Sequence, residues 1–250
     1  MKFNKNFKRL FCSLLTVTFI MGSACASYAA VKKYSFSDLD IEIEVPNELA
    51  VFTRNVTSAD NNLQLIDATS DELLVMFEQH DIYLEAFPKN VLYEIVVSGK
   101  PVSADVKDLD KLSDTEINQG LQAYREKCES VGTDEIFDVT TYKNNSTIFY
   151  VANFKTVSND VTVFTKKYYT VMQGKEVNFT IQSKDIAVTD IEASQIKAIV
   201  DSTVFKQIDS SIFDSPIFTE ISGYLFGLFV SVAVLFAIIL VVKKSTKKQQ

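Results

Sequence analysis

Residues 161–182 read VTVFTKKYYTVMQGKEVNFTIQ, and this stretch decides the fold. Two runs rich in β-branched and aromatic residues, which favour strands, flank the dipeptide Gln173-Gly174. A two-residue turn with glycine where φ must be positive is a strong hairpin signal. After the turn, Val177, Phe179 and Ile181 alternate with polar residues. The stretch therefore predicts an antiparallel hairpin whose second strand has one apolar face.

The strand pattern continues on the N-terminal side of this hairpin. Residues 136–182 form one meander, because polar turn signals interrupt the apolar runs at 143–145 and 158–160. Near the start of the chain, the run Ile41–Pro46 alternates aliphatic and acidic residues before the proline, which predicts a half-buried strand within residues 34–53. Two further strands are predicted at 82–87 and 91–97, the second ending at residues 98–101.

Three capping boxes mark helix starts between the strands. In this motif a Ser or Thr and a Glu three residues later satisfy backbone N–H groups at a helix N-terminus. Each box is followed by apolar residues at three- and four-residue spacing, which predicts an amphipathic helix. The boxes and their helices are Thr69/Glu72 to Gln79, Ser113/Glu116 to about Ser130, and Thr189/Glu192 to Val204-Phe205.

These elements predict an α+β domain in which an antiparallel sheet meander is covered by helices, an α-β-α sandwich. The opening run Ile41–Pro46, the central meander and the closing helix into Ile199–Phe205 resemble the PsbP-like, or Mog1-like, domain. The resemblance implies an accessory, binding or assembly module rather than an enzyme. It carries over no functional residue, because no site motif in the chain matches one.

The first residues have the order of an export signal. Lys2, Lys5, Lys8 and Arg9 precede an apolar stretch that would span only about 18 Å as a helix, too short for a bilayer core. We predict a signal peptide at 1–29, cleaved after Ala29 or, alternatively, near Ala26. Lipidation at Cys25 is a weaker alternative, because the position three residues upstream lacks a bulky aliphatic residue.

A second apolar run predicts the membrane anchor. No charged residue occurs between Ile221 and Val242, which would span about 33 Å as a helix. Four lysines follow it and acids precede it, so the C-terminal side is cytoplasmic. The predicted order is an extracytoplasmic domain at 30–206, a linker at 207–219, one C-terminal transmembrane helix at 220–242 and a basic cytoplasmic tail at 243–250. The chain is then a single-pass protein of the cell membrane.

Charge and composition limit the partners. Eight of the 25 Lys and Arg residues lie in the first nine and last eight positions, and 31 of the 32 acids lie in 30–219, so this segment carries a charge of about −14. Such a field repels nucleic acid, which we exclude as a partner. Many Lys, Asn and Ile residues and no Trp are typical of a low-GC Gram-positive bacterium.

The residues that usually carry chemistry are sparse. His80 is the single histidine, and Cys128 is the single cysteine of residues 30–219 and lies on the apolar stripe of its helix, so we assign both structural roles. The ectodomain glycines are isolated, which excludes a phosphate-binding loop. We predict no catalytic, cofactor-binding or metal-ligating residue and no cofactor. The acids Asp105, Asp108, Asp110 and Asp114 lack the glycine and terminal glutamate of a calcium loop.

Small residues recur in the predicted transmembrane helix. Gly223, Gly227 and Ser231 share one helix face, which favours close approach of two helices and predicts a weak homodimer. The most favoured function is a membrane-anchored cell-surface module for binding or assembly with another cell-surface or membrane protein. The alternative is a surface hydrolase that uses paired carboxylates, which the many acids would permit.

Overall fold

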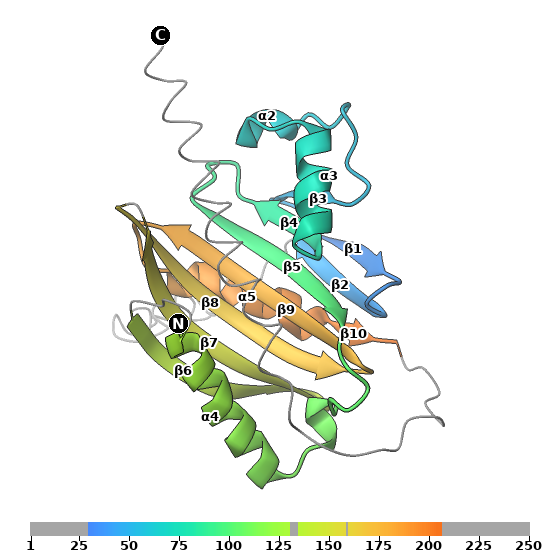
Figure 1. Cartoon of the computed structure of the whole chain (residues 1–250). Coiled ribbons are helices and arrows are strands. Elements are labelled where there is room, and N and C mark those ends of the chain that lie inside the picture. The colour runs from blue at the N-terminus through green and yellow to red at the C-terminus, as the bar shows by residue number, and fades with distance from the viewer. Residues whose placement is uncertain (1–29, 131–134, 159, 207–250) are drawn as a thin grey trace, which may run out of the picture. The chain divides into compact units, whose positions relative to one another are not determined.

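The computed structural model of the chain describes residues 30–130, 135–158 and 160–206. In these ranges it is an α+β domain of antiparallel strands and helices (Figure 1). The predicted signal peptide, linker, transmembrane helix and tail lie outside the described residues, as do Gly223, Gly227 and Ser231. Within the described ranges, no helix has both the length and the apolarity needed to cross a membrane.

A seven-stranded sheet forms the centre of the domain, and every neighbouring pair in it is antiparallel. The predicted hairpin is confirmed, because Gln173 and Gly174 both have positive φ, at 56° and 71°, between the paired strands. In spatial order the strands are β3 (Ala50–Thr53), β4 (Ile82–Phe87), β5 (Tyr93–Pro101), β9 (Lys175–Lys184), β8 (Val161–Met172), β7 (Thr147–Ser158) and β6 (Glu135–Asn144).

The strand end predicted at residues 98–101 is wrong. Strand β5 continues through Pro101, paired with β9 along its whole length. Gly99 serves here as a strand residue without a side chain: a Cβ atom on it would lie 2.4 Å from the carbonyl oxygen of Glu176 and 2.9 Å from a methyl group of Leu39. Glycine within a strand often marks such a close approach of another backbone.

A second, three-stranded sheet consists of β1 (Val31–Phe36), β2 (Ile41–Pro46) and β10 (Val204–Phe205). The half-buried strand predicted from the alternating run is confirmed as β2, because Ile41, Ile43 and Val45 are buried and the residues between them are half-buried. The single strand expected within residues 34–53 is in fact parts of three strands, divided between the two sheets.

The capping boxes begin helices at the predicted places. Thr69 and Thr189 form reciprocal boxes with Glu72 and Glu192. Glu116 accepts the Ser113 backbone N–H at 2.8 Å, and the Glu116 N–H donates back to the Ser113 hydroxyl at 3.3 Å. The helices are α2 (Leu63–Ile66), α3 (Ser70–Gln79), the 3₁₀ helix η1 (Leu109–Lys111), α4 (Asp114–Ser130) and α5 (Asp190–Ser202).

Helices lie on both faces of the large sheet (Figure 1). On the face that we call the α5 face, α5 and the three-stranded sheet enclose the largest apolar cluster, which includes Phe149, Phe179 and Ile199. On the opposite face, the α3–α4 face, α3 packs on β4 and α4 packs on β6 and β7. Each of these two helices covers its own apolar cluster, so the middle of the α3–α4 face separates two cores.

Candidate functional site

A band of polar side chains crosses the middle of the α3–α4 face, on strands β4, β5, β9 and β8. All of these side chains are buried. Cross-strand pairing places Glu94 opposite Gln182 and Thr180 opposite Lys167. We call this band the polar stripe, and its members are Glu85, Glu94, Ser98, Thr165, Lys167, Glu176, Asn178, Thr180 and Gln182.

Two carboxyl groups meet at the end of the polar stripe that borders the apolar cluster under α3. Glu85 and Glu94 stand on neighbouring strands, and a hydrogen bond joins their carboxyls. Burial raises the pKa of Glu85 to about 7, and the hydrogen bond with Glu94 opposes this rise. Burial first, and then the charge and hydrogen bond of Glu85, raise the pKa of Glu94 well above its ordinary value. The pair therefore holds a proton near neutral pH.

Several oxygens of the polar stripe have no hydrogen-bond partner. Glu85 Oε2, Glu94 Oε1 and Gln182 Oε1 are unpartnered at the acidic end, and Glu176 Oε1 and both side-chain polar atoms of Asn178 are unpartnered farther along β9. Each unpaired buried polar atom costs about 1–3 kcal/mol. Natural proteins leave buried polar groups unsatisfied mainly at functional sites. The polar stripe is therefore the candidate functional site.

The other end of the polar stripe is basic. Burial lowers the pKa of Lys167 to about 8, against the nearby Glu176 carboxylate, which raises it. Burial also raises the pKa of Glu176, and the charges of Lys167 and Lys100 oppose this rise. Lys100 Nζ lies 3.8 Å from Glu176 Oε1. The polar stripe thus joins a protonated carboxyl pair at one end to a lysine and glutamate group at the other.

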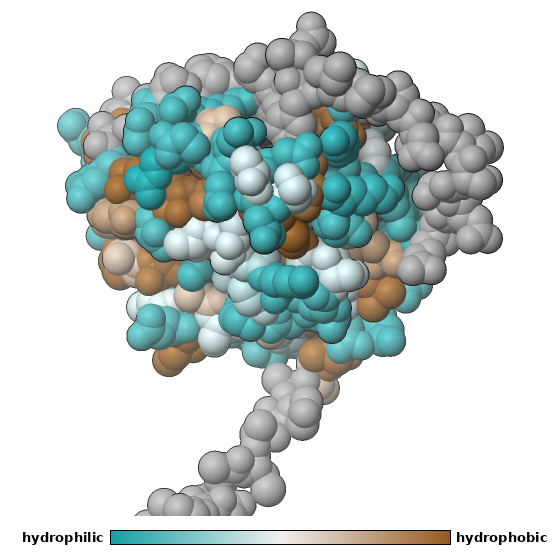
Figure 2. Space-filling model, turned by 90° about the horizontal axis from the view of Figure 1, so that it is seen from below, coloured by the Kyte–Doolittle hydropathy of each residue, from teal (hydrophilic) through white to brown (hydrophobic). Residues whose placement is uncertain are grey.

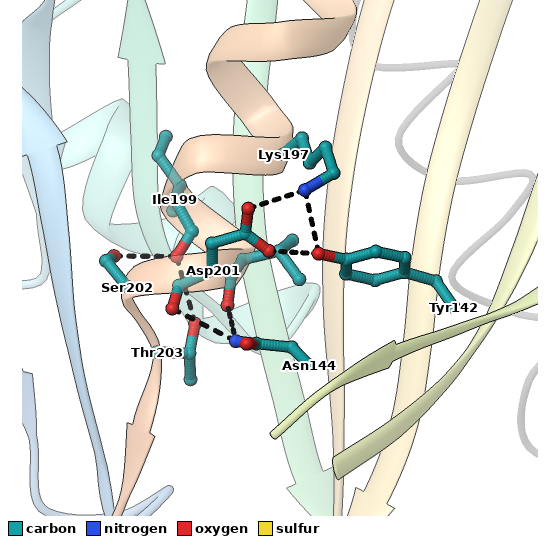
Figure 3. Close-up of polar contacts among 8 residues, drawn as sticks. Tyr142, Asn144, Lys197, Ile199, Asp201, Ser202 and Thr203 are labelled. Atoms are coloured by element: carbon teal, nitrogen blue, oxygen red, sulfur yellow. Dashed lines mark hydrogen bonds and ion pairs between the residues drawn. The ribbon is translucent and has the colours of Figure 1, made fainter. Parts of the chain in front are cut away.

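A separate polar cluster lies at the C-terminal end of α5 (Figure 3). Lys197 Nζ is 2.6 Å from Asp201 Oδ2 and 2.8 Å from Tyr142 Oη, and the Tyr142 hydroxyl donates to Asp201. Hydrogen bonds to Asp201 and Tyr142 raise the pKa of Lys197. Asn144 Nδ2 donates to the carbonyl oxygens of Val200 and Asp201 at 3.2 and 3.0 Å. Because these carbonyls lie at a helix end, the cluster fastens α5 to β6, and we assign it a structural role.

Exposed apolar side chains give no second candidate. On the side seen in Figure 2, hydrophilic residues are interspersed with small hydrophobic patches. Single exposed apolar residues of this kind are normal on a protein surface. In the described ranges the large ones each lie on a different helix, strand or loop: Val31, Val75, Leu92, Phe137, Val157, Ile186, Ile191 and Val204.

The histidine and the cysteine singled out in the sequence are not members of the polar stripe. His80 ends α3, where its backbone N–H donates to the Met76 carbonyl oxygen, and burial lowers the pKa of its imidazole while Asp81 opposes that shift. Cys128 is fully buried under α4, as predicted, and burial raises the pKa of its thiol to about 11. A thiol in this state is a poor nucleophile.

The aspartates of residues 105–114 support the chain locally. Asp108 is buried, accepts the backbone N–H of Gly174 at 3.1 Å and lies 3.1 Å from Lys111 Nζ, so it holds the β8–β9 turn in place. Asp105 accepts a hydrogen bond from the hydroxyl of Ser103. In the part of the chain that the structure describes, no three His, Cys, Asp or Glu residues are grouped to hold a metal ion.

Solved structures share the fold at a distance. The chain resembles PsbP and Mog1. It is similar to the cyanobacterial PsbP protein CyanoP from Synechocystis sp. PCC 6803, at 13% identity and a TM-score of 0.43 over 73% of this chain and 96% of that one. A mutant of the protein Mog1 matches at 15% identity and a TM-score of 0.35 over 74% and 100% of the two chains. Neither a protein-family model nor a curated sequence matches.

A protein from Bacteroides thetaiotaomicron VPI-5482 is also similar, at 8% identity and a TM-score of 0.41 over 70% of this chain and 48% of that one. Together these matches confirm the predicted resemblance as a weak, fold-level one. At such low identities and scores, the likeness assigns no activity, ligand or partner.

Sequence reasoning missed the polar stripe. The alternation of β9 was recognised, but its polar residues from Glu176 to Gln182 are buried like the apolar ones. Two signals were present in the sequence. Glu85 interrupts the apolar run Ile82–Phe87, and Glu94 interrupts the run 91–97. A lone acid within an otherwise buried strand is costly unless it is paired or bound, so it marks a position of interest.

Proposed function

We propose that this chain is a membrane-anchored cell-surface module, and that it binds or assembles with another protein through the polar stripe of an α-β-α sandwich head. The observation that carries the proposal is the set of buried, unpartnered oxygens on Glu85, Glu94 and Gln182. They stand on three consecutive strands of a sheet that rigidly fixes their positions. A binding site of this kind gains affinity because its polar groups are already oriented.

The proposed location and orientation of the module are inferred from the sequence. We propose that residues 1–29 are removed on export and that residues 220–242 cross the membrane, which leaves 30–206 outside the cytoplasm. Protease added to intact cells should then cleave within the head, and an antibody against residues 243–250 should detect the anchored remainder. Full protection of the head would contradict this orientation.

The predicted transmembrane helix adds a second proposal, a weak homodimer through Gly223, Gly227 and Ser231. Small residues on one face let two helix backbones approach closely. In a bilayer dimerisation assay, Gly227→Leu should weaken association, whereas Val232→Leu, which changes an aliphatic residue on the other side of the helix, should leave it unchanged. Equal association of the three sequences would contradict the pairing.

Binding through the polar stripe can be tested in living cells by site-specific photo-crosslinking. A crosslinker at the half-buried Lys184, two residues from Gln182 on the same face of β9, reports on the polar stripe, and one at the exposed Lys143 on β6 serves as the control. The proposal predicts discrete adducts from position 184 that are absent from position 143. Adducts of the same pattern from both positions, or from neither, would contradict binding at the polar stripe.

One observation favours the alternative function, a hydrolase with paired carboxylates. Glu85 and Glu94 are adjacent, and one of them holds a proton near neutral pH, as a general acid requires. If the pair is catalytic, the full-length chain will turn over members of a glycoside and ester panel, and Glu94→Gln will abolish that turnover while Glu78→Gln on α3 will not. Such a result would replace the binding proposal.

A further inference from the structure

The acidic end of the polar stripe has a definite geometry. Glu94 on β5 lies directly opposite Gln182 on β9, and Gln182 in turn lies opposite Thr165 on β8. Residues directly opposite each other on one face have Cβ atoms about 4.5–5.5 Å apart. Glu85 on β4 is a diagonal neighbour, hydrogen-bonded to Glu94. Three oxygen-bearing side chains from three strands thus converge.

These side chains are almost completely removed from solvent. Glu85 is 3% exposed, Glu94 2% and Gln182 4%, and each has one oxygen without a hydrogen-bond partner. Gln182 is an observation independent of the acid pair, because its amide carries no charge and its oxygen is unpartnered whichever carboxyl holds the proton. All three orphan atoms are acceptors, so the group that completes the site must be a donor.

We infer that the site formed by Glu85, Glu94 and Gln182 binds a cationic amine, such as the ammonium group of a lysine side chain on a partner protein. An ammonium group has three N–H donors and no acceptor, which matches three orphan acceptors. The inference rests on the proposed binding function and names the chemistry that the polar stripe recognises.

The charge also matches. Since the pair keeps one proton, it carries a single negative charge at slightly alkaline pH, which one ammonium balances. The other charged groups of the surrounding elements are Lys100, Lys167, Glu176 and Lys184 on the same face of the sheet, and the exposed Asp71, Glu72 and Glu78 on α3. The net field at the site is therefore negative, and a cation is favoured over an anion.

The neighbours of the site are apolar core residues. On the same face, Glu85 of β4 lies between Phe52 of β3 and Val96 of β5, each directly opposite it. Both belong to the apolar cluster under α3, together with Phe87. A lysine side chain buries its methylene groups along apolar surface while its ammonium finds polar partners. This arrangement favours a lysine-like ligand over a small inorganic cation.

The test uses the full-length chain in a mild detergent and isothermal titration calorimetry. The probes are N-acetyl-lysine methylamide, its uncharged norleucine equivalent and calcium chloride. We expect the lysine probe to bind at pH 8 and to bind about tenfold more weakly at pH 5.5, where the carboxyl pair becomes neutral. At pH 8 its affinity should be about tenfold higher than that of the norleucine probe. Equal binding of the two organic probes, or calcium binding without lysine binding, would overturn the inference.

Variants locate the binding. Glu94→Gln should weaken the lysine probe about tenfold, and Glu78→Gln, an exposed glutamate on α3, should not weaken it. Gln182→Met removes an acceptor without touching either carboxyl, and it should also weaken binding. This variant keeps the test possible if Glu94→Gln does not fold. Loss of affinity in Glu78→Gln, or none in both site variants, would contradict the inference. If the lysine probe fails while crosslinks from position 184 persist, the inference falls and the proposed function stands.

Discussion

The Cα atom of Gly99 lies so close to the backbone of Glu176 that a Cβ atom added to Gly99 would stand 2.4 Å from the Glu176 carbonyl oxygen. The absence of a side chain at Gly99 lets β5 lie this close to β9, and this strand pair brings Glu94 opposite Gln182. The central pairing of the sheet therefore depends on a residue with no side chain.

We predict that Gly99→Ala destabilises the protein by about 1–3 kcal/mol, because the neighbour is backbone and yields little. Urea unfolding at pH 7 measures the change. Gly174→Asn is the control: a Cβ there meets nothing within 4 Å, and Asn tolerates the positive φ. A Gly99→Ala variant as stable as wild type would show that the strands can separate without loss.

The cluster at the end of α5 makes a second prediction. Asn144→Ala leaves two helix-end carbonyls without the side-chain donor and should cost about 1–2 kcal/mol. Asp201→Asn weakens an exposed ion pair with Lys197 but keeps an oxygen that can accept from the Tyr142 hydroxyl, so it should cost less than about 1 kcal/mol. Thermal unfolding of the two variants checks the order. The reverse order would mean that charge, rather than capping, fastens α5.

Cys128 should be inert in the native protein. Its thiol is fully buried, and its pKa is raised to about 11, so very little thiolate forms at pH 8. Alkylation with iodoacetamide, followed at the peptide containing residue 128 by mass spectrometry, should proceed only when urea unfolds the chain. Rapid labelling under native conditions would show that α4 opens readily from β6 and β7.

The carboxyl pair predicts how stability varies with pH. The pKa of Glu85 is raised in the folded state from 4.5 to about 7, so the folded state binds more protons between these values. The stability from this group is fully present below pH 4.5 and is lost as pH rises to about 7. Glu116 acts oppositely: its pKa is lowered to about 2 by Ser113, so its contribution is lost as pH falls from 4.5.

Glu85→Gln should therefore stabilise the protein more at pH 8 than at pH 5, by roughly 1–3 kcal/mol, since it removes a carboxyl that is costly to ionise. Urea unfolding at both pH values measures the difference, and Glu78→Gln controls for the change in net charge. A pH-independent effect of Glu85→Gln would mean that the carboxyl ionises freely.

Local signals made much of the fold predictable. The capping boxes at Thr69, Ser113 and Thr189 locate helix starts because their hydrogen bonds lie within four residues. The Gln173-Gly174 turn fixes the β8–β9 register for the same reason. By contrast, β5 pairs with β9 and not with β6. The hydrophobic periodicity of a strand does not show which distant strand will pair with it, and here the two strands are about 80 residues apart.

The candidate site depends on that distant pairing. Glu94 and Gln182 are 88 positions apart in the sequence and meet only because β5 and β9 are neighbours. The burial of Asn178 likewise depends on tertiary packing, since alternation in β9 is equally typical of a strand with one solvated face. The sequence could show lone acids in apolar strands, but it could not show that two of them share a proton.

The central claim is that Glu85 and Glu94 form a protonated pair in the folded protein, and carbon NMR tests it directly. In the full-length chain with ¹³C at the glutamate carboxyls, a pH titration follows each group. We predict one resonance with a midpoint near pH 7, coupled to a second that titrates higher, and loss of this behaviour in Glu85→Gln but not in Glu78→Gln. Midpoints between about pH 4 and 5 for both Glu85 and Glu94 would contradict the account.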